Sequence, residues 1–124
     1  MKNKKLQCST ATYLSKQEKE RLVSISREID IPYCRIMRQL IRYALNGQID
    51  WLEIFKKTNG PGMELVKEKG DVRITRTTMS PDLYTAFVQY VEEKGSTTSI
   101  VLRRLILLYI TGGIGRRAIW LIQG

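Results

Sequence analysis

The hydrophobic and polar positions follow the same three-part pattern twice along the chain. A short alternating stretch rich in threonine comes first, over residues 10–14 and again over 75–79, and a serine follows each. Apolar residues then recur at helical spacing through two successive stretches, which are separated by 30–32 in one half and by 95–97 in the other. Each second helical stretch ends at a glycine, a common helix stop. The pattern predicts strand, helix and helix, in that order, twice.

An internal repeat relates the two halves. Sliding the chain against itself by 65 residues aligns them without a gap. The aligned pairs include Thr10 and Thr75, Thr12 and Thr77, Ser15 and Ser80, Arg38 and Arg103, and Leu40 and Leu105. A lone strand leaves its backbone unpaired, whereas two copies can pair their strands and bury one face on the helices. We therefore expect one body that is mainly α with a two-stranded antiparallel β-ribbon.

The repeat also predicts the organisation of the chain. The expected segments are a first repeat with a basic N-terminal arm over 1–48, a partly helical connecting segment over 49–70, a second repeat over 71–113 and an apolar C-terminal tail over 114–124. Within the connecting segment, Ile49 and Leu52 fall on one helical face. The stretch 105–110 is apolar nearly all round, which indicates burial on more than one side. Together with the tail, this helix is our candidate for self-association between chains.

Charge indicates the kind of partner. The chain carries 21 Lys and Arg against 12 Asp and Glu, a formal net charge of +9. Such a balance favours a polyanion, either nucleic acid or an anionic membrane surface. The longest apolar run is too short to span a bilayer, and no apolar stretch follows the basic N-terminus as a secretion signal would. We therefore expect no membrane partner and a cytoplasmic location.

Catalytic and metal chemistry find little support in the composition. The chain has no His, which removes the commonest general base and the commonest metal ligand. Cys8 and Cys34 stand in no metal-binding spacing, and we expect them to be buried and inert. A Ser/Lys or paired-carboxylate site stays formally open, but no spacing points to one. The expectation is a protein that is not an enzyme and has no catalytic residues, metal, cofactor or small-molecule substrate.

The two halves resemble the ribbon-helix-helix superfamily of DNA-binding proteins, of the Arc/MetJ/CopG type. The resemblance rests on TATYLS and PYCRIMRQLIRYALNG in the first half, and on TRTTMSPDLYTAFVQYVEEKG and STTSIVLRRLILLYITGG in the second. It covers about residues 6–48 and 71–113. Most members of the superfamily carry one copy and dimerise, and two copies in one chain resemble its tandem members, the TraY-type conjugation proteins and regulators of archaeal viruses. The resemblance implies two ribbon-helix-helix repeats that form one intrachain pseudo-dimer, with double-stranded DNA as the partner.

Strand alternation divides the ribbon into two faces. Leu14 and Met79 should point inward, which places the four threonines at 10, 12, 75 and 77 on the same face. The outward positions, which the resemblance implies contact DNA bases, are Ser9, Ala11, Tyr13, Ile74, Arg76 and Thr78. Arg76 is the strongest candidate because its planar fork can bond O6 and N7 of guanine together. For Ser9 and Ala11 a merely solvent-facing role is an equal alternative. Val72 and Ile74 share the outward parity, so either the strand begins with a bulge or Ile74 makes an apolar contact in the groove.

The resemblance also implies that DNA phosphates bind at the N-terminus of each second helix, where free N–H groups and the helix dipole favour anions. The second copy offers Ser96, Thr97 and Thr98 there. The first copy has Pro32, which lacks an N–H, and no hydroxyl in place of Thr97. We expect cations to compensate, and the candidates are Lys16, Arg35 and the basic arm with Lys4 and Lys5. The alternative for these charges is a solvated surface.

Three functions follow from the resemblance. The first is a sequence-specific transcription regulator that inserts its β-ribbon into the major groove of double-stranded DNA. The second is an accessory DNA-binding protein of plasmid conjugation or partition. The third is an antitoxin, which is less favoured because the tail is apolar and short, whereas an arm that wraps a toxin would be longer and polar. Copurification of a stable partner protein would favour the second or third over the first.

Overall fold

The computed structural model describes residues 7–54 and 72–121 of the 124-residue chain. Its elements are β1 (Cys8–Ser15), α1 (Lys16–Ile29), α2 (Tyr33–Leu45), the short α3 (Trp51–Ile54), β2 (Val72–Met79), α4 (Pro81–Glu93), α5 (Thr98–Thr111) and a 3₁₀ turn, η2 (Ala118–Trp120). The described chain is mainly helical, with β1 and β2 paired in a two-stranded antiparallel sheet. The fold class predicted from the sequence is confirmed at this level.

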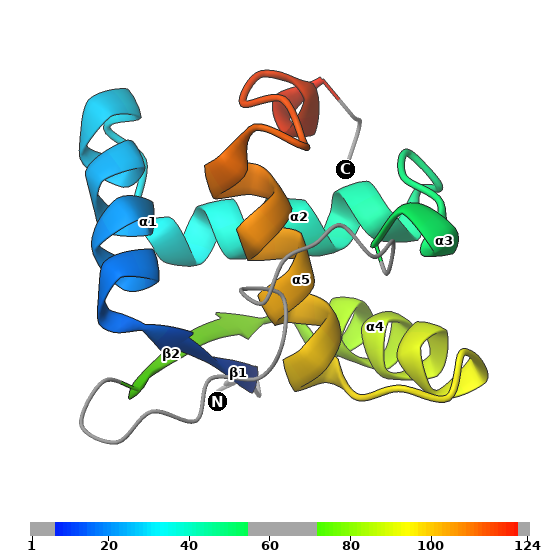
Figure 1. Cartoon of the computed structure of the whole chain (residues 1–124). Helices are drawn as coiled ribbons and strands as arrows, with labels where there is room; N and C mark the ends of the chain where they lie inside the picture. The colour runs from blue at the N-terminus through cyan, green and yellow to red at the C-terminus, as the bar shows by residue number, and fades with distance from the viewer. Residues whose placement is uncertain (1–6, 55–71, 122–124) are drawn as a thin grey trace, which may run out of the picture.

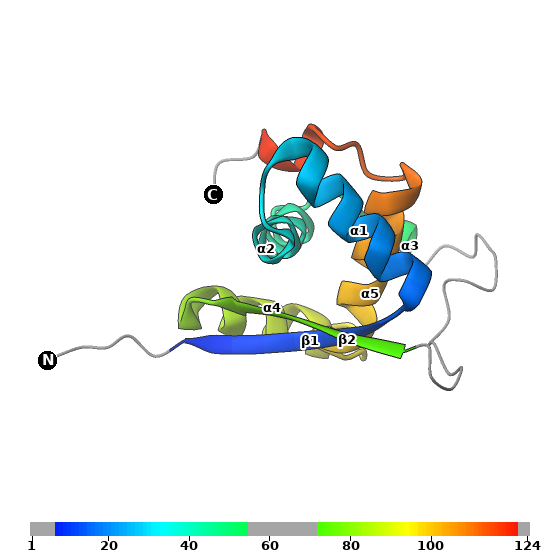
Figure 2. The same ribbon diagram turned by 90° about the vertical axis from the view of Figure 1, so that its left-hand side faces the viewer.

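The ribbon lies along one edge of the molecule, and the helices leave from its two ends. Figure 1 shows α1 continuing from the end of β1 and α4 from the end of β2, with α2 and α5 crossing each other between them. The ribbon and η2 lie on opposite sides of the helices (Figure 2). One face of the ribbon is therefore covered by helices, while the other is not covered by any element that the structure describes.

Both helices that follow a strand begin as the sequence predicts. Ser15 caps α1 by accepting a hydrogen bond from the Glu18 N–H, and the Glu18 side chain accepts from the Ser15 N–H, which completes a capping box. Ser80 caps α4 by accepting from the Leu83 N–H, with Pro81 in the first turn. These caps separate strand from helix at a defined residue, so the ribbon ends where each serine stands.

The two strands pair in a continuous register, from Cys8 opposite Met79 to Ser15 opposite Val72. Over these residues each position has one partner, so the bulge that the sequence left open is not present. The inner face is buried as predicted: Leu14, Met79 and the threonines at 10, 12, 75 and 77 are all at most 6% exposed. Ile74 consequently points outward from a regular strand.

Helix α5 is the centre of the hydrophobic core. Apart from Arg104 and Leu108, all its residues from Val101 to Ile110 are buried, and the helix contacts β1 and the other four helices. The predicted burial on more than one side is thus confirmed. Because this apolar surface is used inside the chain, it does not support the expected self-association through α5.

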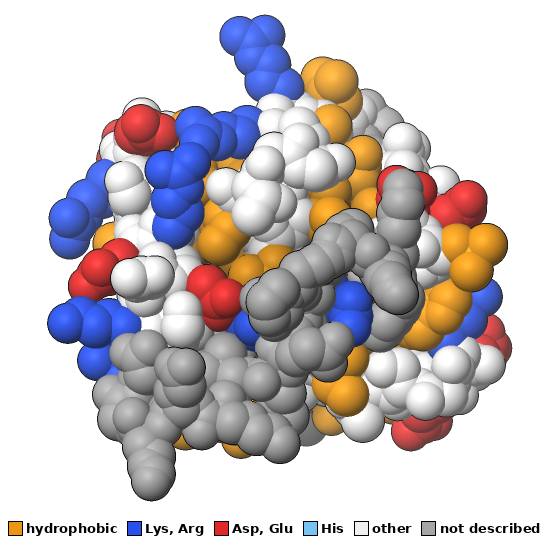
Figure 3. Space-filling model, viewed as in Figure 1, with side chains coloured by type: hydrophobic (Ala, Val, Ile, Leu, Met, Phe, Trp, Pro, Cys, Tyr) orange, Lys and Arg blue, Asp and Glu red, His pale blue; other side chains and the backbone are white. Residues whose placement is uncertain are grey.

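The segments outside the two halves pack differently from the sequence expectation. In α3 the buried residue is Ile54, while Leu52, which the sequence placed on one helical face with Ile49, is 79% exposed. Figure 3 shows hydrophobic side chains at the surface over this part of the molecule. At the other end, Ile119 of η2 is fully buried, and its carbonyl accepts a hydrogen bond of 2.7 Å from the Gln39 side chain. The tail is therefore joined to α2 through both its packing and its backbone.

Two further expectations bear on chemistry and location. Cys8 and Cys34 are both free thiols, and each is half-buried where we expected full burial. In the part of the chain that the structure describes, no helix has the length and apolar character needed to cross a membrane.

Candidate nucleic-acid interface

The uncovered face of the ribbon carries the side chains that the sequence analysis placed there. Along the ribbon the outward pairs are Ser9 with Thr78, Ala11 with Arg76, and Tyr13 with Ile74. All are exposed except Ala11, which is half-buried. Alternation and register thus bring the predicted base-contacting residues together on one surface, which we call the ribbon face.

The chemistry of the ribbon face changes from one end to the other. Ser9 and Thr78 supply two hydroxyls at one end, each able to donate and accept. Arg76 stands in the central pair with its guanidinium exposed. Tyr13 and Ile74 form an aromatic and aliphatic pair at the other end, 40% and 56% exposed. A two-stranded ribbon has the width that the major groove of B-DNA admits, so this face can present hydroxyl, cationic and apolar groups to base edges.

Buried threonines tie the opposite face of the ribbon to the beginnings of two helices. The Thr12 hydroxyl donates to the Ser99 carbonyl at 2.7 Å, in the first turn of α5. The Thr77 hydroxyl donates to the Cys34 carbonyl at 2.9 Å, in the first turn of α2. Each strand therefore lies against the N-terminus of a helix that belongs to the other half of the chain.

Two arginines hold the backbone of the ribbon at the positions of outward side chains. Arg103 of α5 donates to the Tyr13 carbonyl at 3.2 Å, and Arg38 of α2 donates to the Thr78 carbonyl at 3.1 Å. Arg103 is only 3% exposed and also forms a two-pronged contact with Glu18, at 2.7 and 3.3 Å. These contacts restrict the path of both strands, and so the direction in which the ribbon face points.

Our sequence analysis missed the role of both arginines. It aligned Arg38 with Arg103 and used them only as evidence for the repeat. The available signal was an arginine that recurs at the equivalent position of the second helix in both halves. In both halves it donates to a backbone carbonyl of the ribbon, from a buried side chain in Arg103 and from a half-buried one in Arg38.

The two helix N-termini beside the ribbon differ in their capping. In α5, Thr97 is the N-cap and its hydroxyl accepts from the Ile100 N–H at 3.3 Å. In α2, Pro32 is the N-cap and makes no side-chain capping bond. Ser96 and Thr98 are half-buried and Thr97 is exposed. The N-terminus of α5 therefore offers hydroxyls next to its backbone N–H groups, whereas that of α2 offers backbone alone.

The predicted cations do not all gather at the ribbon. Lys16 is exposed and is the first residue of α1, directly after the end of β1. Arg35 lies with its guanidinium 5.8 Å from the centre of the Trp120 ring, which directs it toward η2, on the far side of the helices from the ribbon. Lys4 and Lys5 are outside the described residues.

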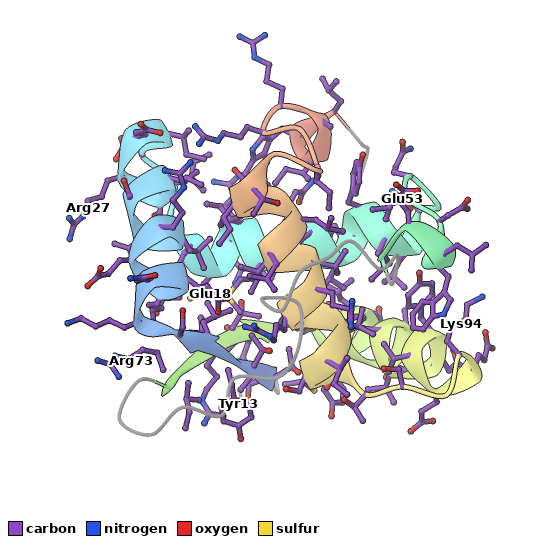
Figure 4. All side chains as sticks on the ribbon, viewed as in Figure 1. Tyr13, Glu18, Arg27, Glu53, Arg73 and Lys94 are labelled. Atoms are coloured by element: carbon purple, nitrogen blue, oxygen red, sulfur yellow. The ribbon has the colours of Figure 1, made fainter. Side chains whose placement is uncertain are left out.

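In the views of Figures 3 and 4, charged side chains of both signs lie on the surface away from the ribbon. Figure 4 shows Tyr13 and Arg73 at the ribbon, Glu18 where α1 begins, and Arg27 at the far end of α1. In the view of Figure 3, Lys and Arg over α1 are mixed with Asp and Glu. Among the described residues, no group of three Cys, Asp or Glu side chains is placed to hold a metal ion.

Comparisons with family models, with curated proteins and with solved structures find no match to this chain. The functional argument therefore depends on the geometry and chemistry of the ribbon face itself.

Proposed function

We propose that this protein binds double-stranded DNA through its β-ribbon and acts as a sequence-specific transcription regulator. The observation that carries the proposal is the ribbon face: an exposed two-stranded surface with Arg76 in its central pair and hydroxyls at one end. An arginine at such a position can bond a guanine edge with two hydrogen bonds. The net charge of +9 adds attraction to the DNA backbone that does not depend on sequence. The regulatory role follows from the resemblance to ribbon-helix-helix proteins.

The proposal includes the tandem arrangement, in which two ribbon-helix-helix repeats form one pseudo-dimer within the chain. The strand register supports it, because Ala11 is opposite Arg76, the residue 65 positions later, which is the spacing of the internal repeat. A pairing centred on equivalent residues is what an approximate two-fold axis through the ribbon requires.

Hydrogen bonds between the halves support the same arrangement. The bond from Thr12 to Ser99 and the bond from Thr77 to Cys34 become equivalent when one half is shifted by 65 residues. The same shift relates the contact of Arg103 with the Tyr13 carbonyl to that of Arg38 with the Thr78 carbonyl. Two independent kinds of contact thus recur with the same 65-residue spacing, and this recurrence supports the proposed pseudo-symmetry.

The helix N-termini provide the proposed phosphate contacts. The N-termini of α2 and α5 are attached to the ribbon through Thr77 and Thr12, so their free N–H groups have a defined position relative to the ribbon face. Backbone N–H groups at a helix N-terminus favour a bound phosphate. Because α5 also has the Thr97 hydroxyl, the second repeat should bind its phosphate more strongly than the first.

Unequal repeats should read unequal sequences. Across the proposed axis Ser9 is equivalent to Ile74, Ala11 to Arg76, and Tyr13 to Thr78. The first two pairs differ in polarity or charge, and in the third a tyrosine is equivalent to a much smaller threonine. The proposed DNA site is therefore asymmetric, with the Arg76 repeat contributing more to its specificity.

Binding of duplex DNA at several salt concentrations tests the proposal. If about six phosphates are contacted, the logarithm of the association constant should fall with the logarithm of salt concentration at a slope of about −5. Fluorescence anisotropy with a labelled duplex measures this slope. A flat response between low and moderate salt would contradict DNA binding by this basic protein.

Substitution of Arg76 by Ala separates sequence reading from general attraction. The variant should lose about 1–3 kcal/mol on the specific site and bind unrelated duplexes nearly as the wild type does. Arg27→Ala is the matched control, because it removes the same charge from the exposed far end of α1. If both variants weaken binding equally on both kinds of DNA, Arg76 is not a base-contacting residue.

A further inference from the structure

The Tyr13 and Ile74 end of the ribbon face differs from the rest because Ile74 is a large apolar side chain that is 56% exposed. The two residues are directly opposite each other in the register, and both side chains project away from the core. Ile74 is 56% exposed on a regular strand, so its apolar surface meets water when the chain is alone. Arg103 holds the Tyr13 carbonyl at 3.2 Å, which keeps this end of the ribbon in place.

When the ribbon lies in the major groove, the base edge below this pair must offer an apolar group to Ile74. In the major groove of DNA, the one methyl group on the base edges is the 5-methyl of thymine, while the oxygen, ring-nitrogen and amino groups donate or accept hydrogen bonds. Ile74 opposite an unmethylated polar edge would remove water from that edge and return no hydrogen bond, which is unfavourable. If Ile74 lies opposite a thymine, the 5-methyl group of the base is buried against the branched side chain of Ile74.

We infer that Tyr13 and Ile74 form a thymine-methyl reader, so that the preferred DNA carries thymine under this end of the ribbon. The inference rests on the proposed function and specifies its ligand. Strand residues rise about 3.4 Å each, so Ile74 stands roughly 7 Å along the ribbon from Arg76, which is about two base-pair steps. The thymine therefore lies about two base pairs from the guanine that Arg76 contacts.

The test compares thymine with uracil, which lacks only the 5-methyl group. Affinities are measured for the duplex that the protein selects from a random pool, and for versions of this duplex in which one thymine at a time is replaced by uracil. For the wild-type protein, uracil at the position under Ile74 should weaken binding about fourfold, the factor expected for one buried methyl. Equal affinity for thymine and uracil at every position would overturn the inference, and this comparison needs no protein variant.

A variant assigns the effect to the side chain. Ile74→Ser removes every methyl group of this side chain, so the variant should bind the uracil duplex about as tightly as the thymine duplex. Leu52→Ala is the matched control, because it removes an exposed aliphatic side chain in α3 and should keep the fourfold ratio. If Ile74→Ser also keeps the full ratio, Ile74 is not the reader.

The outcomes separate this inference from the proposed function. Tight, salt-dependent binding with no difference between thymine and uracil would overturn the methyl reader and leave DNA binding in place. Absence of saturable binding to any duplex would overturn the proposed function, and the reader with it.

Discussion

The largely buried ion pair between Glu18 and Arg103 lies beside the ribbon, where Arg103 also donates to the Tyr13 carbonyl. The Arg103 side chain is 4% exposed and that of Glu18 is 17% exposed, with a shortest distance of 2.7 Å. Glu18 also accepts a hydrogen bond from the Ser15 N–H, and Arg103 donates to the Tyr13 carbonyl. Replacing Glu18 with Ala would remove this carboxylate from beside the buried Arg103 charge.

The expected cost of Glu18→Ala follows from this burial. Removing one partner of a buried ion pair typically destabilises a protein by about 3–5 kcal/mol, because the remaining charge stays desolvated. A domain of this size has a free energy of unfolding of about 5–15 kcal/mol, so the change is a large fraction of the total. Urea denaturation followed by circular dichroism measures it, as a shift of the midpoint at constant slope.

Two comparisons show whether burial is the cause. Arg116→Ala breaks the ion pair with Glu28, whose side chains are 43% and 61% exposed, and should cost less than about 1 kcal/mol. The double variant Glu18→Ala, Arg103→Met removes the buried positive charge as well and should be more stable than Glu18→Ala alone. A loss below about 1 kcal/mol for Glu18→Ala, with an unchanged slope, would show that this ion pair contributes no more than an exposed one.

Further stability measurements test other contacts. Ile119→Ala should destabilise the protein by about 2–5 kcal/mol, because Ile119 is fully buried. Leu121→Ala changes an exposed position and should be nearly neutral. Equal effects of the two substitutions would mean that the tail is not part of the core. Thr12→Val and Thr77→Val each remove one hydrogen bond from the ribbon to a helix and should each cost about 1 kcal/mol. A large difference between these two variants would contradict the equivalence of the two halves.

Local patterns were enough to predict the strands and the direction of their side chains. Alternation around Leu14 and Met79 assigned each strand residue to a face, and the serine at the end of each strand located the helix starts. These features depend on neighbours in sequence, through the period of a strand and the chemistry of a cap. The predicted membership of the ribbon face followed from the same period.

Contacts between distant residues were beyond such patterns. The contact of Arg103 with Glu18 and Tyr13 joins three elements, and strand or helix periodicity does not report it. The same holds for Arg35, which the sequence assigned to phosphate and which lies over Trp120. In the connecting segment a helical period placed Ile49 and Leu52 on one face, but the helix contains only Trp51–Ile54, and the residue it buries is Ile54.

Selection of bound duplexes from a random pool tests asymmetric reading of DNA by the ribbon, because an asymmetric motif requires both DNA binding and unequal half-sites. We expect one enriched motif that is not a palindrome and contains a guanine whose enrichment is lost with Arg76→Ala. A palindromic motif would contradict reading by a ribbon whose two strands come from one chain. A pool that shows no enrichment would contradict sequence-specific DNA binding by this protein.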